Sequence, residues 1–406
     1  MFEKETAQLQ QELREIYKDL HRHPEIGFSE HRTAGIIAAF LRRCGIKVSE
    51  GIAITGVVGI LDSGKPGKTV MLRADMDCLQ VQELCESDWK SQEPGRMHAC
   101  GHDAHVAMLL GAAKVLSQHR EAFCGKIKFV FQPAEEETPA AMWDTVRAHG
   151  YNRSGGAGFM VEEGVLDGVD ACVIMHVQPS LPTGTVSIAR KNACASSDGF
   201  TITMMGKGGH GAQPQNAVDP VPAMAELISA IHILPTREVS ALETCVISIG
   251  KVETPGSVWN AVAEKAIISG GFRTFNQNVR KMLDQRIEET AAAIAKAHRC
   301  SIQIDRVVGY MPCVNDETIA RLVAESCTEI LGEGHAILTD APAMTSEDCS
   351  EYLSRVPGVF FWMGIGGEEN AAALHNPYFK MDLEALSTGS LLHVNNALSL
   401  LNKLNG

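Results

Sequence analysis

One stretch of the chain gathers side chains that bind metal ions. Residues Met97–His105 include a thiol, three imidazoles and a carboxylate. Cys100 and His102 flank a glycine, so one tight turn can direct both donors at the same ion. The same residues would also suit a buried thiol beside structural histidines at the start of a helix, which the apolar spacing after Asp103 predicts. The stretch by itself leaves both interpretations open.

Acidic residues and another histidine follow three apolar runs that predict buried strands. The runs at 69–72, 126–131 and 170–175 lead into Asp75 and Asp77, into Glu135 to Glu137, and into His176. Strand carboxyl ends meet at the ligand crevice of an α/β sheet. Each group alone could be an exposed acidic turn or a structural histidine, but three adjacent glutamates favour a cation between them. Their recurrence at strand ends predicts one shared metal site.

The composition describes a globular chain and excludes two classes of partner. The 406 residues are 45% hydrophobic and 21% charged, which suffices for two or three domains. The net charge of -13 would repel the phosphates of a nucleic acid. The sequence shows neither a membrane span nor a secretory signal, and its 12 scattered cysteines indicate reduced thiols rather than a disulfide framework. We therefore expect a cytoplasmic protein.

Hydrophobic periodicity predicts one α/β domain that is interrupted by another. Helices at 4–21, 33–44, 316–331 and 383–401 and strands at 54–61, 69–72, 126–131, 170–175 and 359–363 would build the first domain. Between its two parts lie a strand at 199–205, a helix from 218, strands at 244–252 and 261–275, a helix at 279–297 and a strand at 301–307. This order predicts a smaller α/β sandwich. The expected domains are 1–191 with 311–406, and 192–310.

The motifs, taken in order, resemble those of one enzyme family over nearly the whole chain. The matching strings are His21–Glu25, Leu72–Asp77, Met97–His105, Phe131–Glu136, Gly206–Pro214, Ser346–Asp348 and Leu374–His375. The chain resembles the aminoacylase, hippurate hydrolase and indole-acetyl-amino-acid hydrolase branch of the dinuclear metallopeptidases. That resemblance implies a zinc-peptidase-like α/β catalytic domain with a mixed sheet, and an inserted lid domain that forms a homodimer. It also implies five ligands for two divalent ions: Cys100, His102, Glu136, His176 and His375.

The implied centre can hydrolyse an amide bond. Two ions about 3.5–4 Å apart can hold a shared water, lower its pKa and polarise an amide carbonyl. The resemblance assigns Glu135 to proton transfer, first from the water and then to the departing amine. Asp77 would orient a ligand, and Asp103 and His105 are further candidates for that role. The thiolate of Cys100 is compatible with zinc, whereas manganese, cobalt or nickel suit the other ligands, so the metal stays open.

Three residues of the inserted domain resemble family residues that contact the substrate. His210 resembles a histidine that reaches into the active site of the partner subunit and stabilises the tetrahedral oxyanion. Asn260 and Arg273 resemble binders of the substrate carboxylate, which a guanidinium can grip through two parallel hydrogen bonds. A loop histidine and a surface arginine are the alternatives for His210 and Arg273.

Two features depart from the family pattern. Thr138 to Ser154 form an insertion beside Glu135, and Gln80 stands where the family usually has a proline. We predict a metal-dependent amidohydrolase that cleaves an N-acyl-amino acid into a carboxylic acid and an amino acid. The alternatives are a dipeptidase or carboxypeptidase of the same family and a catalytically silent metal-binding protein of the same fold. The presence of Glu135 beside all five implied ligands argues against the silent protein.

Overall fold

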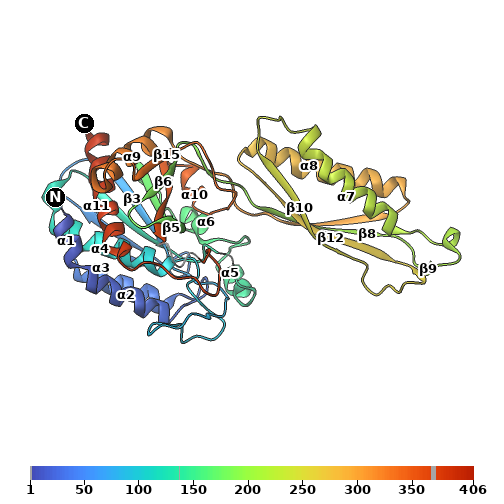
Figure 1. The fold of residues 1–406 in the computed structure, drawn as a ribbon, viewed down its shortest axis with the longest axis horizontal. Coiled ribbons are helices and arrows are strands. Elements are labelled where there is room, and N and C mark those ends of the chain that lie inside the picture. The colour runs from blue at the N-terminus through green and yellow to red at the C-terminus, as the bar shows by residue number, and fades with distance from the viewer. Residues whose placement is uncertain (1, 137, 367–371) are drawn as a thin grey trace. The chain divides into compact units, whose positions relative to one another are not determined.

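The chain divides into two compact units. The computed structural model describes residues 2–136, 138–366 and 372–406 (Figure 1). The first unit comprises Met1–Ala193, Val314–Pro342 and Asp348–Gly406, and the second comprises Cys194–Cys313 and Ala343–Glu347. The short return of 343–347 to the second unit was absent from the boundaries expected from the sequence. It carries no strand or helix, so periodicity offers no signal for it.

The first unit is built on an eight-stranded mixed sheet. Its order is β1-β2-β4-β3-β5-β16-β6-β15. The strands are β1 (Lys47–Ile52), β2 (Gly56–Asp62), β3 (Thr69–Asp75), β4 (Lys126–Gln132), β5 (Ala171–Pro182), β6 (Val186–Ala189), β15 (Ala336–Thr339) and β16 (Gly358–Gly366). The pairs β4/β3, β3/β5 and β5/β16 are parallel, whereas β2 and β6 run antiparallel to their central neighbours. The parallel centre aligns several strand carboxyl ends on one edge.

Helices cover this sheet, and one of them carries the metal-binding motif. They are α1 (Glu3–Gln8), α2 (Gln10–Arg22), α3 (His31–Arg43), α4 (His102–Gln118), α5 (Trp143–Ala148), α6 (Gly156–Glu162), α9 (Glu317–Leu331), α10 (Ser350–Leu353) and α11 (Ala385–Asn405). The helix α4 is buried on nearly every side and packs against α2, α11 and β3. A side chain at Gly111 would meet the hydroxyl oxygen of Ser390 at 2.3 Å, so glycine permits the close approach of α4 and α11.

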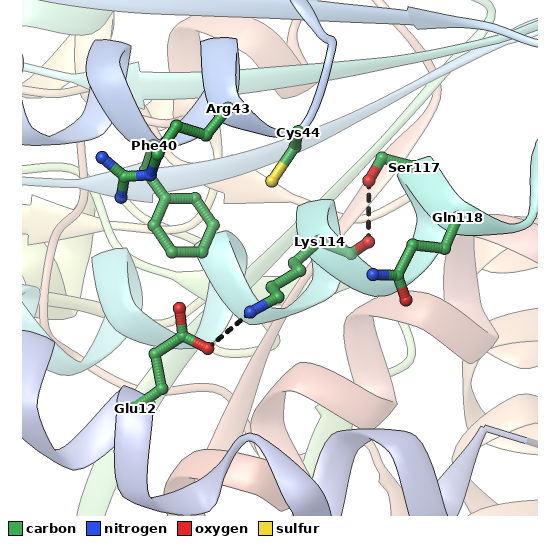
Figure 2. Close-up of a pocket in the computed structure, with 7 residues that line it drawn as sticks. All are labelled: Glu12, Phe40, Arg43, Cys44, Lys114, Ser117 and Gln118. Carbon is green, nitrogen blue, oxygen red and sulfur yellow. Dashed lines mark hydrogen bonds and ion pairs between the residues drawn. The ribbon is translucent and has the colours of Figure 1, made fainter.

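The helices α2, α3 and α4 also enclose a surface pocket of about 400 Å³ (Figure 2). Two of its charged residues already pair with each other, because Lys114 Nζ donates to Glu12 Oε2 at 2.7 Å. The pocket includes the half-buried Cys44, and burial raises the pKa of that thiol.

No helix among the described residues has both the length and the apolar composition that a membrane span needs.

The second unit is a two-layer α/β sandwich. Its sheet has the order β10-β12-β8-β13 and is antiparallel throughout. The strands are β8 (Asp198–Met205), β10 (Cys245–Glu253), β12 (Lys265–Thr274) and β13 (Ser301–Val307), and the helices are α7 (Pro220–Arg237) and α8 (Gln277–Ala297). One apolar core joins the two helices to one face of the sheet. This is the strand and helix order expected from the sequence. A separate ribbon pairs β9 (Gly209–His210) with β11 (Ala261–Val262).

Candidate metal centre

Strand register places Asp75 of β3 at the same level as His176, the predicted ligand on β5. Arg73 of β3 is aligned with Ile174 of β5 in a parallel pair, so Asp75 and His176 lie two residues further along neighbouring strands. The prediction that His176 ends its strand is wrong. The strand continues to Pro182 because β16 pairs with it along that length. His176 nevertheless lies two residues past Ile174, the last residue of β5 that is paired with β3.

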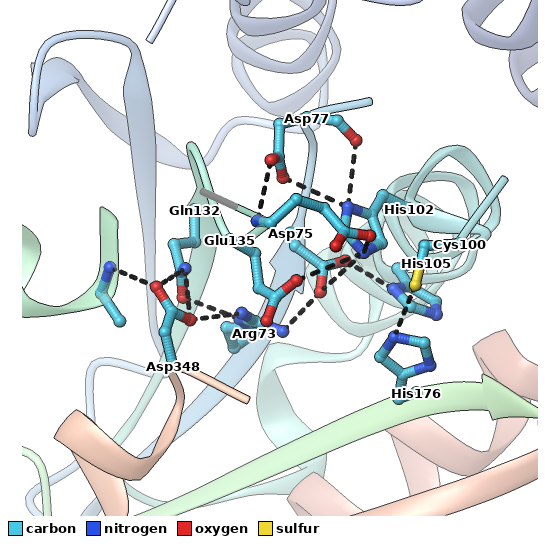
Figure 3. A network of polar contacts seen from close by, with 12 residues as sticks. Arg73, Asp75, Asp77, Cys100, His102, His105, Gln132, Glu135, His176 and Asp348 are labelled. Carbon is cyan, nitrogen blue, oxygen red and sulfur yellow. Dashed lines mark hydrogen bonds and ion pairs between the residues drawn. The ribbon is translucent and has the colours of Figure 1, made fainter. Parts of the chain in front are cut away.

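The five predicted ligands converge in the first unit. Cys100 Sγ lies 3.5 Å from His176 Nε2 (Figure 3). Glu136 Oε1 lies 3.9 Å from His102 Nε2 and 3.2 Å from His375 Nε2. Donor atoms of Cys100, Glu136 and His375 all lie within 4.8 Å of one another, as do those of His102, Glu135 and Glu136. The remaining acid of the run, Glu137, lies outside the described residues.

These separations fit divalent ions. Ligand atoms at about 2.0–2.3 Å from a tetrahedral ion lie about 3.3–3.8 Å from one another, close to the observed range of 3.2–3.9 Å. His102 Nε2 is buried and has no hydrogen-bond partner within the described part of the chain, although carboxylate oxygens of Asp75, Glu135 and Glu136 lie 3.6–3.9 Å away. An imidazole nitrogen aimed at several carboxylates without bonding them suits metal ligation.

The electrostatics of the cluster also call for a cation. Burial lowers the pKa of His102, but the carboxylates of Asp75, Asp77 and Glu136 outweigh burial and raise that pKa to about 10. Burial and the neighbouring glutamates raise the pKa of the Cys100 thiol well above its usual range. Buried negative charge contributes to both shifts. A divalent cation would compensate this charge and would release a proton from the thiol on binding.

Hydrogen bonds aim the imidazoles and the glutamate turn. His102 Nδ1 lies 3.0 Å from Asp77 O and 3.2 Å from Asp77 Oδ1, and donation to them leaves Nε2 facing the cluster. His176 Nδ1 donates to Val177 O at 2.8 Å, with the same result. The other oxygen of Asp77 accepts from the backbone N–H of Glu136 at 3.1 Å. Asp77 therefore has the geometry of the orienting carboxylate that the resemblance implied.

A buried polar network behind the cluster was missed by sequence reasoning. Arg73 is 1% exposed and donates to Asp75 Oδ2 at 2.6 Å, to Gln132 Oε1 at 2.9 Å and to Asp348 Oδ1 at 3.1 Å (Figure 3). His105 Nδ1 donates to Asp75 Oδ1 at 2.5 Å, while its Nε2 accepts from Val177 N. Burial alone would raise the pKa of Asp75, but Arg73, His102 and His105 hold it well below its usual range. An arginine inside an apolar run at 69–74 was the available signal.

A second buried cluster fixes the start of α4 against α2. His21 Nδ1 lies 2.6 Å from Asp103 Oδ2, and its Nε2 lies 3.5 Å from Glu83 Oε1. Burial lowers the pKa of His21, but the hydrogen bond and charge of Asp103, with a contribution from Glu83, raise it to about 9. A protonated His21 therefore joins two buried carboxylates. Asp103, which we considered as an orienting residue, bonds this histidine, and its Oδ1 accepts from Ala104 N.

We expect His21 to stabilise the fold in a pH-dependent way. Because its pKa in the folded chain exceeds that in the unfolded chain, its contribution is complete below pH 6.5 and is lost as the pH rises through about 9. The free energy of unfolding of the native protein should exceed that of His21→Gln by about 2–3 kcal/mol near pH 6. Denaturant unfolding between pH 6 and 10 measures this difference. His119→Gln, which breaks a partly exposed pair with Glu5, is the control and should cost little. A difference that stays constant up to pH 10 would contradict the charge assignment.

The second unit brings two of its three predicted residues together. His210 is the register partner of Ala261 across the β9/β11 ribbon, and Gly211 N donates to Asn260 O at 3.0 Å. Both His210 and Asn260 are exposed. Arg273 lies near the far end of β12 from this ribbon and donates to Met344 O at 3.1 Å. Ten residues lie between Val262 and Arg273, and the span of β12 from Lys265 to Arg273 covers about 26 Å at 3.3 Å per residue.

The two departures from the family pattern have local structural accounts. In the insertion, Thr138 N donates to Ser154 Oγ at 2.7 Å, which closes its two ends. Tyr151 stacks on Phe159 with ring centroids 3.8 Å apart, so this segment packs on α6. The exposed Gln80 follows Leu79, which forms two backbone hydrogen bonds with Met97 at the start of the metal-binding motif.

Comparison with known proteins places the chain among metal-dependent hydrolases. The family model described as peptidase family M20/M25/M40 matches residues 71–397. IAA-amino acid hydrolase ILR1-like 4 of Arabidopsis thaliana is 36% identical over 96% of this chain and 86% of its own length. Thermostable carboxypeptidase 2 of Saccharolobus solfataricus is 33% identical over 96% of this chain and 95% of its own. The crystal structure of a dinuclear metal-binding M20 peptidase from Bacillus subtilis has a TM-score of 0.81 and 30% identity, covering 98% of this chain and 99% of that one.

The fold and the ligand cluster, with these similarities, define a metal-dependent hydrolase that acts on amide bonds. The chain belongs to peptidase family M20/M25/M40. The predicted family and fold class are therefore confirmed, and the ligand cluster together with the dinuclear relative supports two divalent ions.

Proposed function

We propose that this protein hydrolyses N-acyl-amino acids to a carboxylic acid and a free amino acid. The observation that carries the proposal is the position of Glu135. Its Oε2 lies 3.9 Å from His102 Nε2, and it directly precedes Glu136 at the centre of the ligand cluster. A carboxylate that is 5% exposed and adjoins five convergent ligands suits proton transfer beside bound ions.

The proposed roles follow from the chemistry of each side chain. Cys100, His102, Glu136, His176 and His375 would hold two divalent ions, which when bound lower the pKa of a water and polarise the amide carbonyl. Glu135 takes the proton of the attacking water and returns it to the nitrogen of the departing amino acid. Asp77 keeps His102 and the Glu136 turn in position through the hydrogen bonds described above. Manganese, zinc, cobalt and nickel all remain candidates for the metal.

We further propose a homodimer in which the second unit of one subunit completes the site of its partner. His210 would stabilise the charge that develops on the carbonyl oxygen, and Asn260 and Arg273 would bind the substrate carboxylate. The distance along β12 supports two contributing chains. One second unit cannot place both His210 and Arg273 on the same small substrate, because His210 pairs with Ala261, which precedes β12, whereas Arg273 lies near the opposite end of that strand.

A substrate panel tests the proposed activity. The metal-loaded enzyme should cleave acetyl-, benzoyl- or indole-acetyl-amino acids with a kcat/KM at least about tenfold above that for the matching amino-acid amides. The amides lack the carboxylate that a bidentate guanidinium recognises, and such a pair is worth about 1.5–3 kcal/mol. Arg273→Met should remove most of this preference, whereas Arg237→Met, at the C-terminal end of α7, is the control. Equal cleavage of acids and amides by the native enzyme would argue against carboxylate recognition.

A carboxypeptidase or dipeptidase is the second candidate, because a carboxypeptidase is 33% identical in sequence over nearly the whole chain. The same panel should include dipeptides and longer peptides. Preference for peptides over acylated amino acids by a factor of ten would favour that alternative. The absence of any cleavage by the correctly metallated protein would favour a silent binding protein. The cytoplasmic location stays a prediction.

A further inference from the structure

We propose that Glu30 is a positioning residue that clamps the strained turn carrying the proton-transfer residue Glu135. Its Oε1 accepts a hydrogen bond of 2.9 Å from the backbone N–H of Ala134, the residue immediately before Glu135. Glu30 lies more than a hundred positions earlier in the chain, at the start of α3. Among the described residues its carboxylate bonds Ala134 N and Thr55 Oγ1 rather than any of the five proposed metal ligands, so it would act through the backbone of the turn.

The backbone at Ala134 is strained and needs external support. Its φ is +49°, in the left-handed region that non-glycine residues rarely occupy. This conformation costs about 1–2 kcal/mol for an L-residue. The surroundings hold it from both sides, because the Ala134 carbonyl also accepts from Gly156 N at 2.9 Å. Gly156 can approach this closely only without a side chain, since a Cβ there would lie 1.9 Å from Pro133 O. The turn is therefore imposed by its neighbours.

Glu30 itself is rigidly placed. Its side chain is fully buried, and its carbonyl accepts from Ala34 N in the first turn of α3 at 2.9 Å. Its second carboxyl oxygen, Oε2, accepts from Thr55 Oγ1 at 2.6 Å. Burial, with a smaller contribution from Asp77, raises the pKa of Glu30 to about 8. In either protonation state Oε1 can accept from Ala134, because a protonated Oε2 can donate to the Thr55 hydroxyl instead.

Loss of the Glu30 hydrogen bond should affect the position of Glu135 without affecting the binding of metal. Asp77 holds the backbone N–H of Glu136 independently of Glu30. Loss of Glu30 should therefore release Ala134 and displace Glu135, while Glu136 keeps its own support. A displacement of about 1 Å can cost about a hundredfold in rate. This inference rests on the proposed role of Glu135, so Glu135→Gln must be measured in the same series.

The experiment compares two glutamates of the same segment that both bond backbone amides. Glu30→Ala should lower kcat by about 10–100-fold, with two ions per chain retained by elemental analysis and KM within about threefold. Glu30→Gln keeps an acceptor for Ala134 and should stay within about threefold of the native kcat. Glu25→Ala removes a carboxylate that accepts from Arg32 N at 3.0 Å and Thr33 N at 2.8 Å, away from the catalytic turn. It should lower the melting temperature without changing kcat. If Glu30→Ala does not fold, Glu30→Met, which fills a similar volume without an acceptor, replaces it.

Hydrogen exchange supplies a readout that a general loss of stability would not reproduce. Under native conditions the amide of Ala134 should exchange at least about tenfold faster in Glu30→Ala, while in Glu25→Ala the faster amides should be those of Arg32 and Thr33. Native kcat and native Ala134 exchange in Glu30→Ala would overturn the inference, as would an equal loss of kcat in Glu25→Ala. If Glu135→Gln is fully active, the proposed role of Glu135 is wrong, and the inference that rests on it is wrong as well. If Glu135→Gln is inactive and Glu30→Ala is normal, only the clamp fails.

Discussion

Removal of divalent ions should abolish turnover, and their return should restore it. The buried carboxylates around His102 Nε2 form a site whose charge a divalent cation would balance, and bound ions would polarise the amide carbonyl and activate the attacking water. Dialysis against a chelator, elemental analysis and back-titration with manganese, zinc, cobalt or nickel would measure the dependence. If the metal-free protein hydrolyses its substrate at the original rate, the dinuclear mechanism is wrong.

Cys100→Ala should also abolish turnover, because it removes one proposed metal ligand. The variant removes the only thiol donor of the proposed ligand set, so it should bind fewer than two ions per chain and lose nearly all activity. Cys327→Ala is the matched control. Cys327 is also a buried cysteine, but it lies on α9 and contacts Asn396 at 3.7 Å, away from the cluster. The control should be less stable yet keep both ions. Full metal content in Cys100→Ala would remove Cys100 from the ligand set.

Elements with strong local patterns were predictable from the sequence. The alternating and helical spacings of the second unit gave its strands and helices in the right order, because each element there buries one apolar face against a single core. The helix α4 was also expected, although its complete burial was not. The helix predicted at 4–21 is interrupted at Leu9, because α1 ends at Gln8 and α2 begins at Gln10. Nothing in the apolar spacing marks that interruption.

Features that depend on pairing between distant segments were not predictable. The length of β5 is set by β16, nearly two hundred residues away, so the sequence wrongly placed His176 at a strand end. Short strands such as β6 (Val186–Ala189) and β15 (Ala336–Thr339) carry too few residues for a periodic signal, and their mutual pairing stabilises them.

The candidate site could be proposed from the sequence in its residues but not in its supports. The family resemblance supplied the proposed ligands, and the structure brings donor atoms of these residues close together. The role of Arg73 depends on Gln132 and Asp348 from two other segments, and that of Glu30 depends on the conformation of Ala134. An isolated sequence gives no sign that an alanine adopts a left-handed conformation. Such supports are found only when the backbone path is known.

Mixing two inactive variants should restore activity if His210 acts across the dimer. His210→Ala should lose about 10²–10³ in kcat while it still binds metal, because one oxyanion donor is removed. Glu135→Gln should lose about a hundredfold or more for a different reason, the absence of the proton acceptor. Neither substitution changes a proposed metal ligand, so both proteins should retain two ions per chain. Mass spectrometry of intact dimers would verify subunit exchange before activity is measured.

The expected recovery follows from counting sites in the mixed dimers. Under random association about half of the dimers are mixed, and in each of them one of the two sites pairs an intact Glu135 with an intact His210 from the other chain. Activity should therefore return to roughly a quarter of the native value. Mixing Glu135→Gln with Cys100→Ala is the control, because both changes lie in the first unit. In an exchanged dimer of these two variants, each first unit carries one of the two changes, so neither site is intact. That mixture should stay inactive. If verified exchange of His210→Ala with Glu135→Gln restores no activity, His210 acts within its own chain or has no part in catalysis.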